Sequence, residues 1–416
     1  MRVALAGVGR MGSAIAGRLR AAGHRVALYD PALPAGESEP SLAAAASRSV
    51  ITFLCLPDAV AVEASLPGLR EAAPPTVIDL TSSLPATTRR MASALAPLGV
   101  DFLDCPLSGG VAGARAGTLT AMVGGDPALV ERARPVLSAF ASNVRWAGPL
   151  GAGHATKALN NALSAVSLMG TAELLVTAVA HGHREAAVIE AFNAGPARSQ
   201  NSEVKYPRDV LTRTYGAGFT AALLDKDLAT ALRIAAGRSA PAPFLSGVLD
   251  AWREATRAMG ADADFTRFHA VVEARAGVRP GVVGESRRYP PTQRSDVLGD
   301  AYAVDTGGAG VVDVLCRALA TVNLLAAIEV MRVARAEGLD RERVLSIVNT
   351  STGRSEATRS ELSGEVDLAG LAGALELARG AGVWAPVTSL ALALTRLDEA
   401  GRAGQPSPFD TESRLC

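Results

Sequence analysis

A lysine and an asparagine stand four residues apart in the stretch GAGHATKALNN, which covers residues 151–161. In a helix this spacing places Lys157 and Asn161 on one face, one turn apart. A lysine held beside an amide can give up and take back a proton, which is the task of an acid/base catalyst. An ordinary surface lysine near a helix start has the same local sequence, so the choice depends on the residues upstream.

The first thirty residues have the pattern of a dinucleotide-binding unit. A short apolar run at 2–6 leads into GVGRMG, a helical pattern continues to about residue 22, and a second apolar run ends at Asp30. In such a motif the glycines allow a tight turn, let the backbone approach a pyrophosphate, and let the helix pack closely on the strand. The predicted cofactor contacts in this turn are Gly7, Gly9, Arg10, Met11 and Gly12.

The acidic residue after the second strand bears on the choice of cofactor. The carboxylate of Asp30 would accept hydrogen bonds from the adenosine ribose and repel a 2′-phosphate, so the sequence favours NAD over NADP. Arg10 could instead help to hold a phosphate, and NADP is therefore the alternative.

Further apolar strands are predicted at 50–56, at 76–80 and near 101–103, with helical stretches between the first two. This alternation is typical of an α/β Rossmann fold, in which a doubly wound, mostly parallel sheet carries helices on both faces. Such sheets bind ligands at the carboxyl ends of their strands. The strand ends add four predicted cofactor contacts, namely Leu56, Pro57, Thr81 and Ser82.

The stretch DCPLSGG at 104–110 offers a hydroxyl group followed by two glycines. Ser108, Gly109 and Gly110 could form a small nest of backbone N–H groups that suits a carboxylate or an oxyanion. The alternative is a glycine-rich loop that binds nothing.

Taken together, these motifs resemble those of the β-hydroxyacid dehydrogenase family, which includes 3-hydroxyisobutyrate dehydrogenase and tartronate semialdehyde reductase. The matching stretches are GVGRMG at 7–12, CLPD at 55–58, DCPLSGG at 104–110, GAGHATKALNN at 151–161 and DKDL at 225–228. The resemblance implies an NAD(P)-binding Rossmann domain at residues 1–150, followed by an all-α substrate and catalytic domain at residues 151–277.

The resemblance also implies the roles of individual residues. Lys157 would be the catalytic acid/base, assisted by Asn161. The substrate carboxylate would be held by Ser108, Gly109 and Gly110. Lys226 and Asp227 would close the site over the nicotinamide, and Lys226 would also contact the substrate.

The reaction implied by the resemblance is hydride transfer between the nicotinamide and a small, 3-hydroxyisobutyrate-like β-hydroxyacid or its semialdehyde or ketone. A free lysine has a pKa of about 10.4, too high for a base at neutral pH. We expect partial burial, the cofactor's positive ring and a second cation such as Lys226 to favour the neutral amine. Related imine reductases usually replace the lysine, so Lys157 favours the hydroxyacid branch. An imine or β-hydroxyamino acid substrate and a non-catalytic NAD(P)-binding protein are the alternatives.

The sequence continues well beyond the family's usual end near residue 277. Residues 278–308 are rich in proline and glycine and are predicted to be a linker. Beyond them, eight of thirty residues match between 171–200 and 327–356 at an offset of 156, and eight of nineteen match between 231–249 and 374–392 at an offset of 143. We interpret residues 309–416 as a degenerate repeat of the α-domain.

Asp313 and Arg317 occupy the positions that correspond to Lys157 and Asn161, so the second copy is predicted to pack and not to catalyse. The long form of 6-phosphogluconate dehydrogenase is similar in carrying two related α-halves. We therefore expect either a homodimer or a monomer with an intrachain pseudo-dimer, in which the second copy takes the place of a partner subunit.

Composition narrows the class of protein further. Basic and acidic residues number 41 each, so no charge excess points to nucleic acid or to a membrane surface. No uninterrupted apolar run is long enough to cross a bilayer. Four scattered cysteines without CxxC spacing suit reduced thiols and a cytoplasmic location. No metal-binding motif is present, and the histidines at 181 and 183 lack the spacing of a site.

Overall fold

The computed structural model describes residues 1–34, 36–278 and 310–400. It divides into two compact units: residues 1–160, 233–239 and 334–351 form the first, and the remaining described residues form the second. All but the first residue of the predicted linker at 278–308 lies outside the described residues.

The first unit contains an eight-stranded sheet in the order β2-β1-β3-β4-β5-β7-β6, with β8 beside β7. Its central strands are apolar and buried, as expected when helices cover both faces of a sheet. Pairing is parallel except that β7 runs antiparallel to β5 and β6. The strands are β1 (Arg2–Ala6), β2 (Arg25–Tyr29), β3 (Ile51–Leu54), β4 (Thr76–Asp79), β5 (Asp101–Asp104), β6 (Leu107–Ser108), β7 (Thr120–Gly124) and β8 (Asn143–Gly148).

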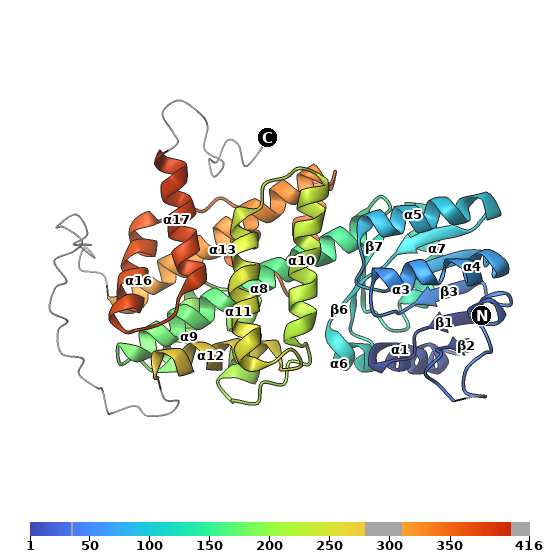
Figure 1. Ribbon diagram of the computed structural model, residues 1–416, viewed down its shortest axis with the longest axis horizontal. Helices are drawn as coiled ribbons and strands as arrows, with labels where there is room; N and C mark the ends of the chain where they lie inside the picture. The colour runs from blue at the N-terminus through green and yellow to red at the C-terminus, as the bar shows by residue number, and fades with distance from the viewer. Residues whose placement is uncertain (35, 279–309, 401–416) are drawn as a thin grey trace. The chain divides into compact units, whose positions relative to one another are not determined.

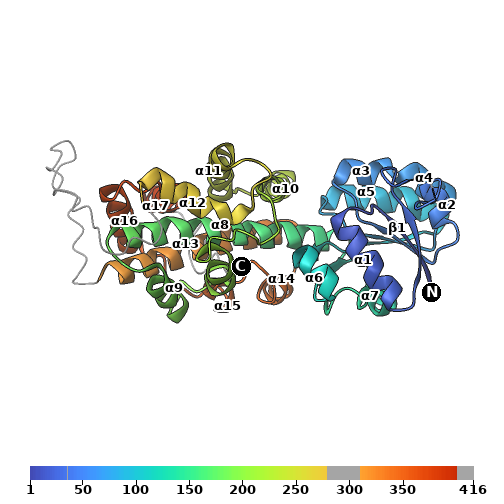
Figure 2. The ribbon, with the colours of Figure 1, turned by 90° about the horizontal axis from the view of Figure 1, so that it is seen from below.

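Helices cover the sheet on both faces, and each face has its own apolar core. Figure 2 shows α1, α6 and α7 on one side of the strands and α2 to α5 on the other. Side chains of α1 and α7 supply much of the first core, whereas Leu69, Met91 and Leu95 belong to the second. The helices are α1 (Arg10–Ala21), α2 (Leu42–Ala46), α3 (Ala59–Ala64), α4 (Leu66–Ala72), α5 (Pro85–Leu95), α6 (Gly110–Ala116) and α7 (Pro127–Leu137). The predicted Rossmann fold class is confirmed.

Residues from far along the chain complete this unit. Helix α14 (Arg341–Val348) packs on β8, where the guanidinium of Arg343 lies 4.1 Å from the ring centroid of Trp146. Asn143 also donates a hydrogen bond to Thr350 over 3.3 Å. The sequence after the predicted linker therefore contributes to the first unit, which the motifs did not indicate.

The second unit is helical, as the fold class predicted (Figure 1). The long helix α8 begins in the first unit and continues into the second. The helices before the gap in the described residues are α8 (Ala152–Ala180), α9 (Glu185–Ala194), α10 (Ala221–Gly237), α11 (Pro243–Met259) and α12 (Phe268–Ala276), with a π-helical segment at Asn201–Val210. After the gap follow α13 (Val311–Ala336), α15 (Glu356–Arg359), α16 (Leu368–Gly380) and α17 (Pro386–Ala400).

By length and composition alone, α8 and α13 are apolar enough to cross a membrane. Polar residues interrupt both helices, which is why no continuous apolar run stands out in the sequence. Of their most apolar windows, 94% and 67% of residues are buried inside the protein. Burial of this kind is typical of the core helices of a folded domain.

Two buried glutamates make reciprocal contacts between the sequence copies. Glu173 on α8 accepts hydrogen bonds from the backbone N–H groups of Val387 and Thr388, at the start of α17. Glu329 on α13, 156 positions later, accepts hydrogen bonds from the backbone N–H groups at positions 244 and 245, at the start of α11. Each copy therefore caps a helix of the other, and the contacts follow both offsets of the sequence repeat.

A second pair of reciprocal contacts follows the same offset of 156. Ser199 and Ser355 form an antiparallel backbone bridge. Around it, the N–H of Gln200 donates to the carbonyl oxygen of Arg354 over 2.9 Å, and the N–H of Glu356 donates to the carbonyl oxygen of Arg198 over 2.8 Å. In an interface with two-fold symmetry, residue i contacts j and j contacts i. The contacts at 199 and 355 have this character within one chain.

Candidate active site

The glycine turn after β1 has the shape that a dinucleotide requires. Gly7 has a φ of +89°, and a Cβ placed there would lie 2.2 Å from the carbonyl oxygen of Cys55. A Cβ on Gly12 would lie 2.0 Å from the carbonyl oxygen of Gly7, so the helix packs directly on the turn. No atom lies within 4 Å of a Cβ built on Gly9, which leaves that side of the turn open to a pyrophosphate.

Helix α1 presents its N-terminus at the same place. Gly9 is the N-cap and provides no side-chain hydrogen bond to the first turn. Arg10 is exposed and Met11 is half-buried at the start of the helix. Since the first N–H groups of a helix lack intrahelical partners, they can bind phosphate oxygens here. The turn therefore fits the group that the fold implies.

The carboxylate of Asp30 is fixed beside the glycine turn. Its two oxygens accept hydrogen bonds from the backbone N–H groups of Val8, over 2.7 Å, and Ala32, over 2.9 Å. The side chain is half-buried and stands at the end of β2. With the pyrophosphate on the glycine turn, the hydroxyl groups of the adenosine ribose would donate hydrogen bonds to this carboxylate.

The predicted contacts after β3 and β4 meet at neighbouring strand ends. The N–H of Leu56 donates to the hydroxyl of Thr81 over 3.1 Å, which ties the two loops together. Pro57 is exposed and Ser82 is half-buried. These four residues therefore lie at the carboxyl edge of the sheet, on the same edge as Gly7.

The Ser-Gly-Gly stretch lies at the end of β6 and at the start of α6. Ser108 is buried at 5% exposure, and Gly109 and Gly110 have φ angles of +123° and +66°. Glycine adopts such angles without the steric cost that other residues meet. The turn thus depends on both glycines, and it leaves the first N–H groups of α6 without a side-chain cap.

The start of α8 is anchored to the end of β5 by one carboxylate. Asp104 accepts hydrogen bonds from the N–H groups of Gly151, over 2.7 Å, and His154, over 2.8 Å. A Cβ on Gly153 would lie only 2.2 Å from the carbonyl oxygen of Met122, so the first turn of α8 lies against β7. Lys157 follows one turn later and is buried, with 8% of its surface exposed.

In the second unit, Asn161 donates a short hydrogen bond from its side-chain amide to Asp227 on α10. Both residues are buried, and Lys226 is half-buried beside Asp227. Asn161 lies one helical turn after Lys157 on α8, as the spacing requires. The hydrogen bond fixes the orientation of the amide, and it links the GAGHATKALNN stretch to the DKDL stretch.

Sequence reasoning missed the residues that hold these groups in place. Asp104 and His154 both lie inside recognised motifs; the sequence indicates no role for Asp104, and for His154 it leaves open a pocket-lining residue or a polar residue at a helix start. The partner of His154, Thr88, lies in α5, outside every motif. The alternation of buried strand and polar strand end at Asp104 was the signal that could have drawn attention to this position.

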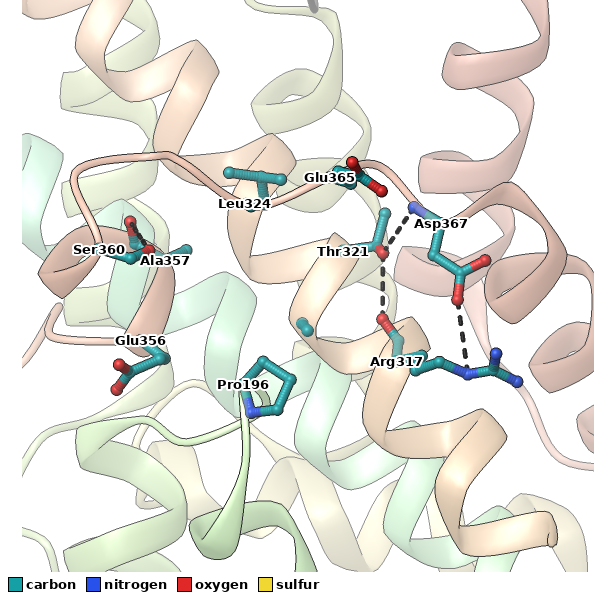
Figure 3. Close-up of a pocket in the computed structure, with 11 residues that line it drawn as sticks. Pro196, Arg317, Thr321, Leu324, Glu356, Ala357, Ser360, Glu365 and Asp367 are labelled. Atoms are coloured by element: carbon teal, nitrogen blue, oxygen red, sulfur yellow. Dashed lines mark hydrogen bonds and ion pairs between the residues drawn. The ribbon is translucent and has the colours of Figure 1, made fainter. Parts of the chain in front are cut away.

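A cavity of about 240 Å³ lies in the second unit and contains none of the predicted site residues. Figure 3 shows the side chain of Arg317 directed toward the carboxylate of Asp367, and the hydroxyl of Thr321 on the same helix beside the backbone nitrogen of Asp367. The guanidinium Nε lies 3.5 Å from that carboxylate. At the offset of 156, position 317 corresponds to Asn161, so an ion pair stands here at the position equivalent to the amide. No described residue of this lining is a lysine or histidine that could transfer a proton.

Among the described residues, one group has the composition of a metal site: Glu185, His269 and Glu273. The guanidinium of Arg213 lies 2.5 Å from the first carboxylate and 2.9 Å from the second. This cation pairs with both carboxylates, so we interpret the group as an ion-pair cluster that ties the loop at 211–220 to α9 and α12.

The fold and the glycine turn define a dinucleotide-binding domain, and comparison with known proteins shows that the chain is an NAD(P)-dependent oxidoreductase. Residues 2–148 match the family model described as the NAD-binding domain of 6-phosphogluconate dehydrogenase. Residues 151–272 match the family model described as the NAD-binding domain of NADP-dependent 3-hydroxyisobutyrate dehydrogenase.

Individual relatives show which NAD(P)-dependent enzymes the chain is similar to. The chain is 33% identical over 295 residues to the NAD-dependent L-serine dehydrogenase of Pseudomonas aeruginosa, covering 66% of this chain and 99% of that enzyme. The solved structure of Mycobacterium tuberculosis 3-hydroxyisobutyrate dehydrogenase with L-serine has a TM-score of 0.61 at 29% identity, covering 65% of this chain and 98% of that one. The chain belongs to the β-hydroxyacid dehydrogenase family that includes 3-hydroxyisobutyrate dehydrogenase.

The additional C-terminal helices also have a counterpart among solved structures. The match to the solved structure of Plasmodium falciparum 6-phosphogluconate dehydrogenase covers 98% of this chain and 94% of that chain, with a TM-score of 0.66. At 15% identity this likeness concerns the fold alone. The family's oxidoreductase half is therefore combined here with a longer helical region of the 6-phosphogluconate dehydrogenase type.

Proposed function

We propose that the chain interconverts a small β-hydroxyacid and its semialdehyde or ketone, with Lys157 as the general acid/base. The observation that carries this proposal is the position of Lys157. It is a buried lysine one turn into a helix whose start is hydrogen-bonded to the end of β5, in the unit that contains the glycine turn. An acid/base residue must be held within reach of one proton, and this anchoring provides a fixed origin for its side chain.

The roles of the chain's own residues follow from this assignment. Bound NAD(P) supplies or accepts the hydride at its nicotinamide ring. Lys157 takes the hydroxyl proton during oxidation and returns it during reduction. Asn161, oriented by Asp227, holds the same hydroxyl in place. The N–H groups at Gly109 and Gly110, with the Ser108 hydroxyl, bind the substrate carboxylate, and Lys226 closes over the cofactor and substrate.

NAD is the proposed physiological cofactor. The position of the Asp30 carboxylate, fixed by two backbone N–H groups beside the glycine turn, supports this preference. A 2′-phosphate there would meet a negative charge at close range.

A β-hydroxyamino acid is the second candidate substrate class. It is favoured by the similarity to an L-serine dehydrogenase and to a relative whose structure was solved with L-serine. Such a substrate has the same carboxylate and β-hydroxyl groups, so the proposed roles of Ser108 and Lys157 are unchanged.

We further propose that the second α-copy replaces a partner subunit, so that the chain is a monomer; a cytoplasmic location is proposed from its similarity to metabolic dehydrogenases. The reciprocal caps by Glu173 and Glu329 and the bridge between Ser199 and Ser355 support this proposal. Light scattering on the intact chain tests it: we expect the 42.5 kDa of one chain, and a stable dimer mass would contradict it.

The reaction itself is tested by following NADH formation at 340 nm with matched substrates. The panel should contain 3-hydroxyisobutyrate and L-serine as candidate substrates. Two controls accompany them: the corresponding 2-hydroxyacid, which lacks the β-hydroxyl, and the β-hydroxyacid methyl ester, which lacks the free carboxylate. Each compound is assayed with NAD and with NADP. We expect turnover only where the carboxylate and the β-hydroxyl are both present. Equal turnover of the ester would contradict the proposed carboxylate site.

A further inference from the structure

The end of β4, the end of β5 and the first turn of α8 meet around one buried imidazole. The side chains of His154, Asp79 and Asp104 are fully buried. His154 Nε2 lies 3.8 Å from Asp79 Oδ2, and His154 Nδ1 lies 3.9 Å from Asp104 Oδ2. The hydroxyl of Thr88 on α5 makes a 2.7 Å hydrogen bond with Nδ1. The ring is therefore surrounded by groups from three elements besides its own.

Each of these elements leads directly into a predicted part of the active site. Asp79 is followed by the cofactor loop that contains Thr81, and its Oδ1 accepts a hydrogen bond from the N–H of that residue over 2.9 Å. Asp104 is followed by the loop that carries Ser108. His154 precedes Lys157 by three residues on α8. The imidazole thus stands where the cofactor loop, the substrate loop and the catalytic helix begin.

We propose that His154 is a positioning residue, which fixes the rotation of the first turn of α8 and thereby the direction of Lys157. This inference rests on the proposed function of Lys157. The two N–H groups bound by Asp104 hold the backbone of the first turn near β5, and the imidazole adds a side-chain contact to the same turn. The ring contacts Thr88 of α5 and faces Asp79 of β4, so it restrains the rotation of this turn relative to two further elements.

Two unpaired atoms support this interpretation. Among the buried side-chain atoms of the described residues, Asp79 Oδ2 and His154 Nε2 have no hydrogen-bond partner, and they face each other. Their separation of 3.8 Å is too short for a water molecule to bridge and slightly too long for a hydrogen bond. A small rotation of α8 would bring the two atoms within hydrogen-bond distance, so a bond formed there would join the first turn of the helix to the end of β4.

Neighbouring positions of a helix at i and i+3 lie on adjacent parts of its surface. A change in the tilt of residue 154 is therefore transmitted to residue 157 with no flexible link between them. Because misplacement of a reacting group by about 1 Å can cost roughly 100-fold in rate, even a small loss of anchoring should be measurable.

The test compares His154→Ala, His154→Gln and Thr88→Val in the full chain with the hydroxyacid that the 340 nm assay identifies. We expect His154→Ala to lower kcat by about 10- to 100-fold, with KM and the NAD dissociation constant changed less than about threefold. His154→Gln should recover most of kcat, because an amide can accept from Thr88 and donate to Asp79. Thr88→Val should lower kcat in the same direction.

The outcomes separate this inference from the proposed function. If Lys157→Ala abolishes turnover but folded His154→Ala keeps kcat within about twofold, the positioning role is wrong and the catalytic role of Lys157 stands. If His154→Gln is as impaired as His154→Ala, the hydrogen-bonding role is likewise wrong. If His154→Ala does not fold, Thr88→Val decides, and an unchanged kcat in that variant overturns the inference. Near-normal turnover by Lys157→Ala would instead overturn the proposed function.

Discussion

The buried carboxyl group of Glu173 should make the stability of the helical region depend on pH. Its oxygens accept hydrogen bonds from two backbone N–H groups and one hydroxyl at the start of α17. Burial raises the pKa of Glu173 from 4.5 to about 7, although the hydrogen bonds from Thr388 and Val387 act in the opposite direction. The cost of removing the carboxylate from water therefore outweighs the gain from capping the helix.

The sign of the effect follows from linkage. Because the folded-state pKa lies above the unfolded one, the folded chain keeps this proton at pH values where the unfolded chain has lost it. The resulting stabilisation is complete below pH 4.5 and is lost as the pH rises through about 7. Between pH 5 and pH 8 the expected loss is about 2 to 3 kcal/mol.

The assay is urea denaturation of the wild type and of Glu173→Gln at pH 5 and pH 8, with the helical signal as readout. The glutamine does not titrate, so the free-energy difference between wild type and variant should change by about 2 to 3 kcal/mol across this range. For Glu329→Gln, the free-energy difference from the wild type should change with pH in the same direction, because burial raises the pKa of Glu329 too. The exposed Glu376→Gln serves as a matched control. A difference for Glu173→Gln that stays constant with pH would refute the reasoning.

Three further substitutions test the anchoring of the site. Asp104→Asn should destabilise the first unit by about 2 to 4 kcal/mol. The amide oxygen can accept a hydrogen bond from only one of the two N–H groups of α8, and the amide NH₂ group then faces the other N–H. An unchanged denaturation midpoint would count against this. Asp30→Ser should lower the ratio of kcat/KM with NAD to kcat/KM with NADP by about tenfold. This corresponds to losing about 1.4 kcal/mol of repulsion between the carboxylate and the 2′-phosphate. An unaltered ratio would contradict the assigned position of the ribose. Asn161→Ala removes the donor to Asp227 and should lower kcat by about 10- to 100-fold with little change in NAD affinity; a purely KM-based loss would assign the amide to binding only.

The fold of the first unit was largely predictable from the sequence because its signals are local. The glycine turn at 7–12 and the apolar runs that end in polar residues each depend on a few neighbouring positions. The anchoring residues were less accessible. Asp104 acts on Gly151 and His154 across nearly fifty residues, and no short pattern shows which buried carboxylate receives a helix end.

The C-terminal region shows a similar division. The offsets of 156 and 143 could be read from the sequence, and the reciprocal contacts of Glu173 and Glu329 follow them. The packing of α14 on β8 could not, because the stacking of Arg343 on Trp146 joins residues almost two hundred positions apart. The cavity beside Arg317 likewise arises from the packing of separate helices, which pairwise sequence matches do not describe.

The central claim is that the amine of Lys157 transfers the substrate's proton. Chemical rescue of Lys157→Ala tests this most directly, with NADH formation measured while small primary amines of graded basicity are added. We expect kcat to fall by about 10²- to 10⁴-fold, NAD affinity to stay near the wild-type value, and added amines to restore part of the rate in proportion to their basicity. A variant that keeps near-normal kcat, or an inactive one that no amine restores although NAD still binds normally, would contradict the assignment.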